Sequence, residues 1–147
     1  MKFFKQGINS EAHNTAVLFS QAANELYQSY LQKDMAEGKY PPYKASGMAY
    51  IRFAKEEKEL FKLLFMRDRS GERVGENKEE IRPLLEIIRQ NLGLSEEDAY
   101  FFHLEMWIYV HGIATMLATS YLELDEEFIS RVITDGYEGM KARYGKR

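Results

Sequence analysis

The chain has 147 residues, enough for one domain, with a formal net charge of −3 and a pI near 5.7. This charge balance excludes the overall positive charge of a nucleic-acid-binding domain, since such domains usually have a pI above about 9. The sequence contains no cysteine, which excludes disulfides, zinc–thiolate sites and thiol chemistry.

The chain carries no targeting or membrane-spanning signal. Its first residues, MKFFKQGINSEAHN, lack the apolar core and small-residue cleavage site of a signal peptide. The longest apolar run, residues 106–118, is shorter than the ~20 residues that a membrane span needs and contains His111. Together with the absence of cysteine, these features predict a cytoplasmic protein that does not associate with a membrane.

In the first half of the chain, the apolar residues recur at helical spacing. Asn9 and Ser10 indicate a helix start, and the helical pattern continues until Gly38. Two prolines at 41 and 42 open a second helix, where they are tolerated only before or within the first turn. KELFKLLFM (58–66) predicts a short apolar helix, and the polar, glycine-bearing stretch 67–78 predicts a mobile loop.

The second half of the chain predicts three more helices. Residues 77–80 form a cap before the fourth, in which Pro83 either kinks the helix or stands in its true first turn. Ser95 with Asp98 forms an N-terminal box for a long helix that ends near residue 120, and Asp125 caps the last helix. With no alternating strand pattern and no internal repeat, the chain is expected to be an all-α bundle of about six helices.

The last two helices predict a homodimer. Residues 101–117 are apolar on every side, and a helix of that kind is buried on every side. Gly136 and Gly139 cost about 1 kcal/mol each in helix propensity, which close approach of a neighbouring backbone would offset. The alternative is that these glycines merely loosen a C-terminal helix. For a symmetric dimer, the expected interface residues are Ile108, Thr115, Phe128, Val132, Gly136, Tyr137 and Met140.

No arrangement of residues supports catalysis. There is no Gly-x-Ser-x-Gly elbow and no phosphate-binding loop. His103 and His111 are eight residues apart, or about 12 Å along one helix, too far to share an ion. With His13 alone in the first helix, the histidines are expected to be structural or to face solvent. We therefore predict no enzyme activity, no cofactor and no metal.

Three segments carry a resemblance to a known family. Trp107-x-x-x-His111-Gly112 in a long apolar helix resembles the signature of the WHG domain, the C-terminal domain of a branch of TetR-like transcription regulators. MAYIRFAKEEKELFKLLFM (48–66) is similar to that family's fifth and sixth helices. FISRVITDGYEGM (128–140) resembles its final dimer helix. The resemblance covers about residues 20–143.

The N-terminus departs from the family pattern. TetR-like chains begin with a helix-turn-helix unit, whereas residues 1–19 are expected to be the start or remnant of the helix that follows it. Residues 20–143 would form the effector-binding and dimerisation domain, and residues 144–147 a basic tail. DNA would then be bound only through a helix-turn-helix not present in this chain. Whether Met1 is a native start or a truncation stays open.

The resemblance implies an effector-sensing and dimerisation domain of a transcriptional regulator, expected to be a repressor. A small apolar or amphipathic ligand in the helical core would modulate DNA binding by the full regulator. His111 is the expected polar contact, and Trp107, His111 and Gly112 are interpreted first as architecture and second as pocket. The alternatives are a core packed solid and a free-standing helical adaptor that dimerises without a ligand. The expected pocket residues are Phe53, Phe61, Leu64, Phe65, Met106, Trp107, Tyr109 and His111.

Overall fold

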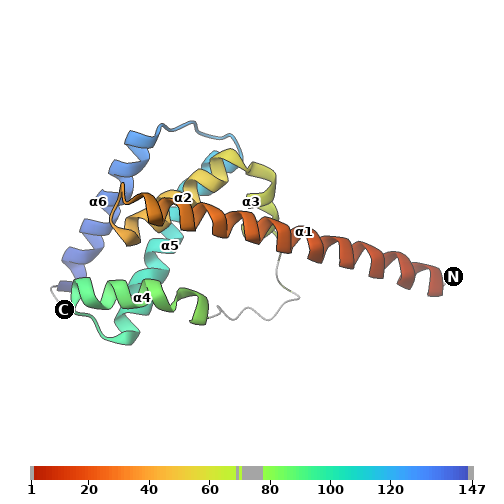
Figure 1. Cartoon of the computed structure of the whole chain (residues 1–147), viewed down its shortest axis with the longest axis horizontal. Coiled ribbons are helices and arrows are strands. Elements are labelled where there is room, and N and C mark those ends of the chain that lie inside the picture. The colour runs from red at the N-terminus through yellow and green to blue at the C-terminus, as the bar shows by residue number, and fades with distance from the viewer. Residues whose placement is uncertain (1, 69, 71–77, 146–147) are drawn as a thin grey trace.

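The chain is built from helices packed around one central helix (Figure 1). The computed structural model describes residues 2–68, 70 and 78–145, without the side chains of residues 2–13, 16 and 78. Over this part of the chain it has no strand, which confirms the all-α prediction. Its helices are α1 (Lys2–Glu37), α2 (Pro42–Glu56), α3 (Lys58–Phe65), α4 (Lys78–Leu92), α5 (Glu96–Ala118) and α6 (Glu126–Gly145).

Helix α2 is the central element because it contacts each of the other five helices. Its small residues Ala45, Ala49 and Ala54 are all buried and let neighbouring helices approach closely. Phe53 is also fully buried, and Pro42 occupies the first turn, where its missing N–H costs nothing. Phe61 of α3 and Phe102 of α5 belong to the core around α2, and both are likewise inaccessible to solvent.

Local sequence signals fix several helix ends as expected. The Ser95 hydroxyl accepts a hydrogen bond from the backbone N–H of Asp98 at 3.1 Å, and the Asp125 carboxylate accepts one from that of Phe128 at 2.8 Å. Gly38 follows α1 with a φ of +67°, a conformation that suits glycine. Pro83 lies inside α4, beyond its first turn. The expected cap residue Asn77, the loop 71–77 and the tail residues Lys146 and Arg147 lie outside the described residues.

Helix α1 is longer than the sequence signals indicate. Its backbone is helical from Lys2, so the predicted start at Asn9 and Ser10 is wrong. A capping residue type marks a helix start only where the preceding chain leaves the helix, and the single Gly7 upstream does not break it. Figure 1 shows the N-terminal half of α1 projecting beyond the bundle, while the C-terminal half packs on α2 and α3.

The last helix also extends further than expected. Tyr144, placed at the start of the basic tail, belongs to α6 and is buried. Its hydroxyl donates a hydrogen bond to the Glu105 carboxylate at 2.9 Å, and its ring lies edge-on to Phe102. The ordered helix therefore includes a residue that anchors the C-terminal end of α6 on α5.

Candidate functional site

A cavity of about 400 Å³ lies among five of the helices, with walls from α1, α2, α4, α5 and α6. This volume falls in the range of about 300–1,000 Å³ that is usual for small-molecule sites. Its residues are Tyr27, Leu31, Pro41, Tyr43, Lys44, Ser46, Gly47, Tyr50, Leu84, Asn91, His103, Met106, Trp107, Val110, Ile133, Thr134, Tyr137 and Glu138.

The inner wall of this cavity is largely aromatic and uncharged. Burial raises the pKa of the Tyr27, Tyr43 and Tyr50 phenols well above the ordinary value of 10.0, so all three stay protonated at neutral pH. Aliphatic and thioether side chains, including Met106 and Val110, complete the surface. Such a wall suits a flat, apolar molecule and offers phenol hydroxyls as hydrogen-bonding groups.

Two tyrosine–histidine pairs connect α2 to α5 beside the cavity. The Tyr43 hydroxyl lies 3.0 Å from Nδ1 of His103, and the Tyr50 hydroxyl lies 2.7 Å from Nδ1 of His111. The later tyrosine on α2 pairs with the later histidine on α5, so the two helices run in the same direction. Burial lowers the pKa of His111, which favours the neutral ring in this contact. Both histidine side chains are thus hydrogen-bonded within the fold.

His111 also contacts Trp107, one helical turn earlier on α5. The two rings stack with centroids 4.6 Å apart and an interplanar angle of 14°, which confirms that the side chains are neighbours. Trp107 does not fill the middle of the core, because 37% of the residue is exposed and it borders the cavity. A Cβ added to Gly112 would meet no atom within 4 Å, so no described helix closes on that glycine.

The cavity is not fully enclosed. Five of its lining residues are exposed, namely Pro41, Asn91, Trp107, Thr134 and Glu138. The Lys44 ammonium group donates a hydrogen bond to the Thr134 hydroxyl at 2.7 Å, which connects the first turn of α2 to α6. We call the side of the cavity formed by Lys44, Thr134 and Glu138 its mouth; it is polar and charged, whereas most of the remaining lining residues are apolar or aromatic.

The pocket residues expected from the sequence lie in different places. Met106 and Trp107 border the cavity. Phe61, Phe65 and His111 lie behind Tyr50, with ring centroids 5.3, 4.9 and 6.1 Å from the centroid of Tyr50. None of these three lines the cavity, and neither do the remaining three: Phe53 is fully buried, Leu64 packs on the core, and Tyr109 lies between α5 and α6.

The expected dimer residues are similarly divided. Ile108 and Phe128 are 59% and 49% exposed, and Thr115, Val132 and Met140 are partly exposed. Tyr137 faces its own chain, where it borders the cavity and lies 5.5 Å from the ring of Phe102. Gly136 receives the ring of Tyr109, since a Cβ there would lie 2.6 Å from Cε1 of that ring. The packing of the Tyr109 ring on Gly136 therefore offsets part of the helix-propensity cost of the glycines in α6, and this contact lies within one chain.

Sequence reasoning missed the tyrosines that form the cavity. Tyr43 and Tyr50 are seven residues apart on α2, and His103 and His111 are eight apart on α5. Each pair spans about two helical turns and so lies on one face of its helix. The matched spacing could have indicated that the two faces meet. For Tyr27 and Leu31 of α1, the only signal was helical periodicity, which does not distinguish a cavity from a core.

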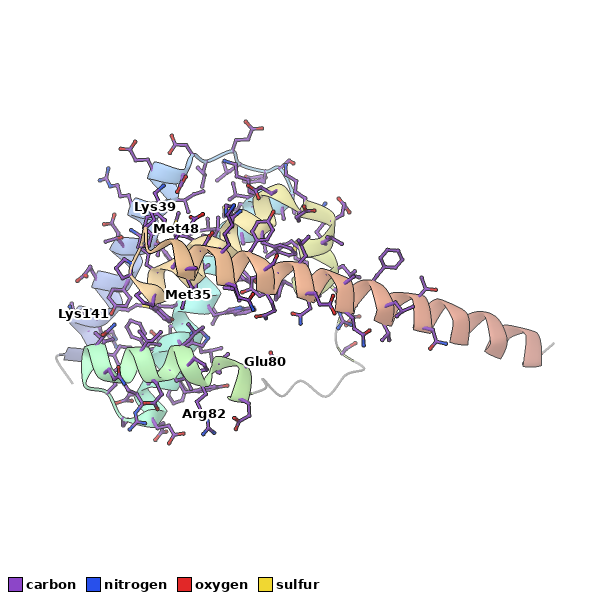
Figure 2. The ribbon with its side chains drawn as sticks, in the orientation of Figure 1. Met35, Lys39, Met48, Glu80, Arg82 and Lys141 are labelled. Atoms are coloured by element: carbon purple, nitrogen blue, oxygen red, sulfur yellow. The ribbon has the colours of Figure 1, made fainter. Side chains whose placement is uncertain are left out.

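A second hollow, of about 370 Å³, lies between the end of α1, α2 and α6. Figure 2 labels two of its lining residues, Lys39 and Met48. Four of its charged groups form ion pairs: Arg52 lies 2.7 Å from the Asp34 carboxylate, and Lys39 lies 2.7 Å from that of Glu126. A ligand would have to displace these ion pairs, so the aromatic cavity is the better candidate site.

The described residues contain no group of three or more metal-ligating side chains of the His, Cys, Asp and Glu types. Over the same ranges, no helix is long and apolar enough to cross a membrane.

The comparisons with known proteins give one family. Residues 43–135 match the family model described as tetracyclin repressor-like, C-terminal domain. Searches of curated proteins and of solved structures returned no significant match. The match spans α2 to the middle of α6, which includes most of the cavity wall, and it makes no assignment to the WHG branch. The chain belongs to the family of tetracyclin repressor-like C-terminal domains.

Proposed function

We propose that this chain is the effector-sensing and dimerisation part of a TetR-like transcriptional repressor, and that the aromatic cavity holds the effector. The observation that carries the proposal is the cavity itself, about 400 Å³ lined by tyrosines, Trp107 and Met106 in a domain of this family. Pockets that bind small molecules are concave and mostly apolar, with a few polar groups that set the ligand's orientation.

The position of α1 supports a route from the ligand to the rest of a regulator. Tyr27 and Leu31 of α1 border the cavity, and the Tyr27 ring lies edge-on to Tyr50 with centroids 5.8 Å apart. A ligand that contacts these side chains favours one position of α1 over another. It changes DNA binding only through this difference in affinity between the two states. In a complete regulator, α1 would carry that change to the DNA-binding unit.

An exposed apolar stripe supports the dimer. Phe101, Ile108 and Met116 of α5 are 47%, 59% and 42% exposed, and their spacing of seven and eight residues places them on one face. Phe128 adds a similar side chain at the start of α6. Exposed apolar surface of this kind is typical of an interaction site. A second copy that presents the same stripe would cover it through a two-fold axis.

A dimerising adaptor without a ligand would use the same stripe but would have no need for the cavity. A cavity-filling variant separates the two functions. Val110 borders the cavity and is 7% exposed, so Val110→Phe places a ring in the space that a ligand would occupy. Leu122→Phe is the matched control, because Leu122 is 41% exposed and lies outside the cavity.

The test is a panel of small aromatic compounds, with unfolding temperature and Trp107 fluorescence as readouts. A compound that binds the native chain should stabilise it by about 2.7 kcal/mol at a hundredfold excess over the dissociation constant. The wild-type chain and Leu122→Phe should respond equally, and Val110→Phe should not respond. If Val110→Phe responds as the wild type does, or if no compound stabilises the chain, the cavity is not an effector site and the adaptor function replaces it.

A further inference from the structure

The mouth of the cavity contains the two side chains of fixed charge among the described residues that line it. They are Lys44 in the first turn of α2 and Glu138 on α6, one turn beyond Thr134. The remaining lining residues are apolar, aromatic or neutral polar groups, apart from His103, whose Nδ1 is hydrogen-bonded to Tyr43. The charge preference of the cavity is therefore decided at the mouth.

Lys44 has neutral partners at this position. Its ammonium group donates to the Thr134 hydroxyl at 2.7 Å and lies 5.1 Å from the centre of the Tyr40 ring. Within the described part of the chain, no carboxylate lies within the 4 Å that an ion pair with Lys44 requires. By contrast, Lys39 in the same region pairs with the Glu126 carboxylate at 2.7 Å. An ammonium group has three donor hydrogens, so Lys44 retains donors for a further acceptor.

Thr134 adds a second donor beside the first. In its hydrogen bond with Lys44 the Thr134 hydroxyl is the acceptor, which leaves its own O–H to donate. An ammonium and a hydroxyl 2.7 Å apart can bind the two oxygens of one carboxylate. The tyrosine rings and Trp107 line the same cavity.

From this arrangement we infer that the effector is an aromatic monocarboxylate. Its ring lies against the Tyr and Trp side chains of the cavity, and its carboxylate binds Lys44 and Thr134 at the mouth. This inference rests on the proposed function, because it assigns a chemical class to the ligand of the same cavity.

Glu138 provides the opposite charge in the same mouth. Its carboxylate repels an anionic ligand and attracts a cationic one, whereas Lys44 does the reverse. Neutral replacements of the two residues should therefore change the affinity for an acid in opposite directions. A neutral ligand of the same shape should be nearly indifferent to both changes, so this pair of variants separates charge recognition from packing.

The experiment titrates naphthalene-2-carboxylate and naphthalene-2-methanol into the full chain by calorimetry, with the variants Lys44→Gln and Glu138→Gln. The acid should bind the wild-type chain more tightly than the alcohol. Lys44→Gln should weaken binding of the acid by about five- to tenfold, as expected for a charge-assisted hydrogen bond near solvent. Glu138→Gln should strengthen binding of the acid, and neither variant should alter the affinity for the alcohol. Added salt should weaken binding of the acid only.

Three results would overturn the inference. If the alcohol binds as tightly as the acid and Lys44→Gln binds both as the wild type does, the cavity selects no acid, although the effector site itself stands. If Glu138→Gln weakens binding and Lys44→Gln strengthens it, the mouth selects cations. If neither compound binds while other members of the panel stabilise the chain, the aromatic acid class is wrong and the proposed function is retained.

Discussion

Tyr50 and His111 form a 2.7 Å hydrogen bond that joins α2 to α5 next to the cavity. The phenol lines the cavity on α2, while the imidazole stacks on Trp107, another lining residue. The pair therefore holds two walls of the site in a fixed relation.

Removal of the Tyr50 hydroxyl should destabilise the fold. Tyr50→Phe keeps the ring in the core but leaves the partly buried His111 without its partner, which costs about 1–3 kcal/mol. Urea unfolding measures this loss. Tyr121→Phe is the control, since Tyr121 is 77% exposed and should lose nothing. Equal stability of the wild type and Tyr50→Phe would show that the hydrogen bond contributes nothing to the fold.

The stability of the chain should depend on pH through His111. Burial lowers the pKa of this residue below its ordinary value of 6.5, so just below pH 6.5 the unfolded chain binds a proton that the folded chain does not. The free energy of unfolding should then fall as the pH decreases below about 6.5, and this contribution should be constant above it. His111→Gln should remove part of that slope in urea unfolding at a series of pH values. An unchanged slope in the variant would assign the pH dependence to other groups.

Sequence reasoning predicts those features of the chain that depend on near neighbours. The caps at Ser95 and Asp125 each need only a residue three positions away, and the Trp107–His111 stack follows from one helical turn. The site depends on packing between helices, which periodicity does not specify. Phe53 and Trp107 are both large aromatic residues within apolar helices, yet the first is fully buried and the second borders a cavity.

The contact between Gly136 and Tyr109 could not be predicted from the sequence for the same reason. A glycine on an apolar helix face indicates close approach, but it does not say whether the neighbour belongs to the same chain. Here the neighbour is Tyr109, whose hydroxyl also donates to the backbone oxygen of Val132 at 3.0 Å.

Gly136 and Gly139 form a matched pair for this contact. Gly136→Ala should push the Tyr109 ring away and strain its hydrogen bond, with a net loss of about 1–2 kcal/mol despite the gain in helix propensity. The Cβ added by Gly139→Ala would meet no atom within 4 Å, so the free energy of unfolding of this variant should rise by up to about 1 kcal/mol. Urea unfolding of the two variants gives the comparison. A gain at Gly136 would mean that the Tyr109 contact is loose.

Charge in the exposed stripe should prevent dimerisation. Ile108→Glu combined with Phe128→Glu places two carboxylates on residues that are exposed in the single chain, so the fold should persist while the dimer is lost. Tyr137 is a poorer choice, because its ring packs inside its own chain. Sedimentation should give a dimer for the wild type and for Leu18→Glu, a control on the exposed part of α1, and a monomer for the double variant. A wild-type chain that sediments as a monomer at micromolar concentrations would refute the interface.

The central claim is that the aromatic cavity holds the effector, and the most direct test is a crystal structure of the chain with the tightest-binding compound of the panel. The compound should lie between α2, α5 and α6, in contact with Tyr43, Met106 and Tyr137. Density for the compound in the charged hollow beside Arg52, or a cavity closed by its own side chains, would contradict the claim.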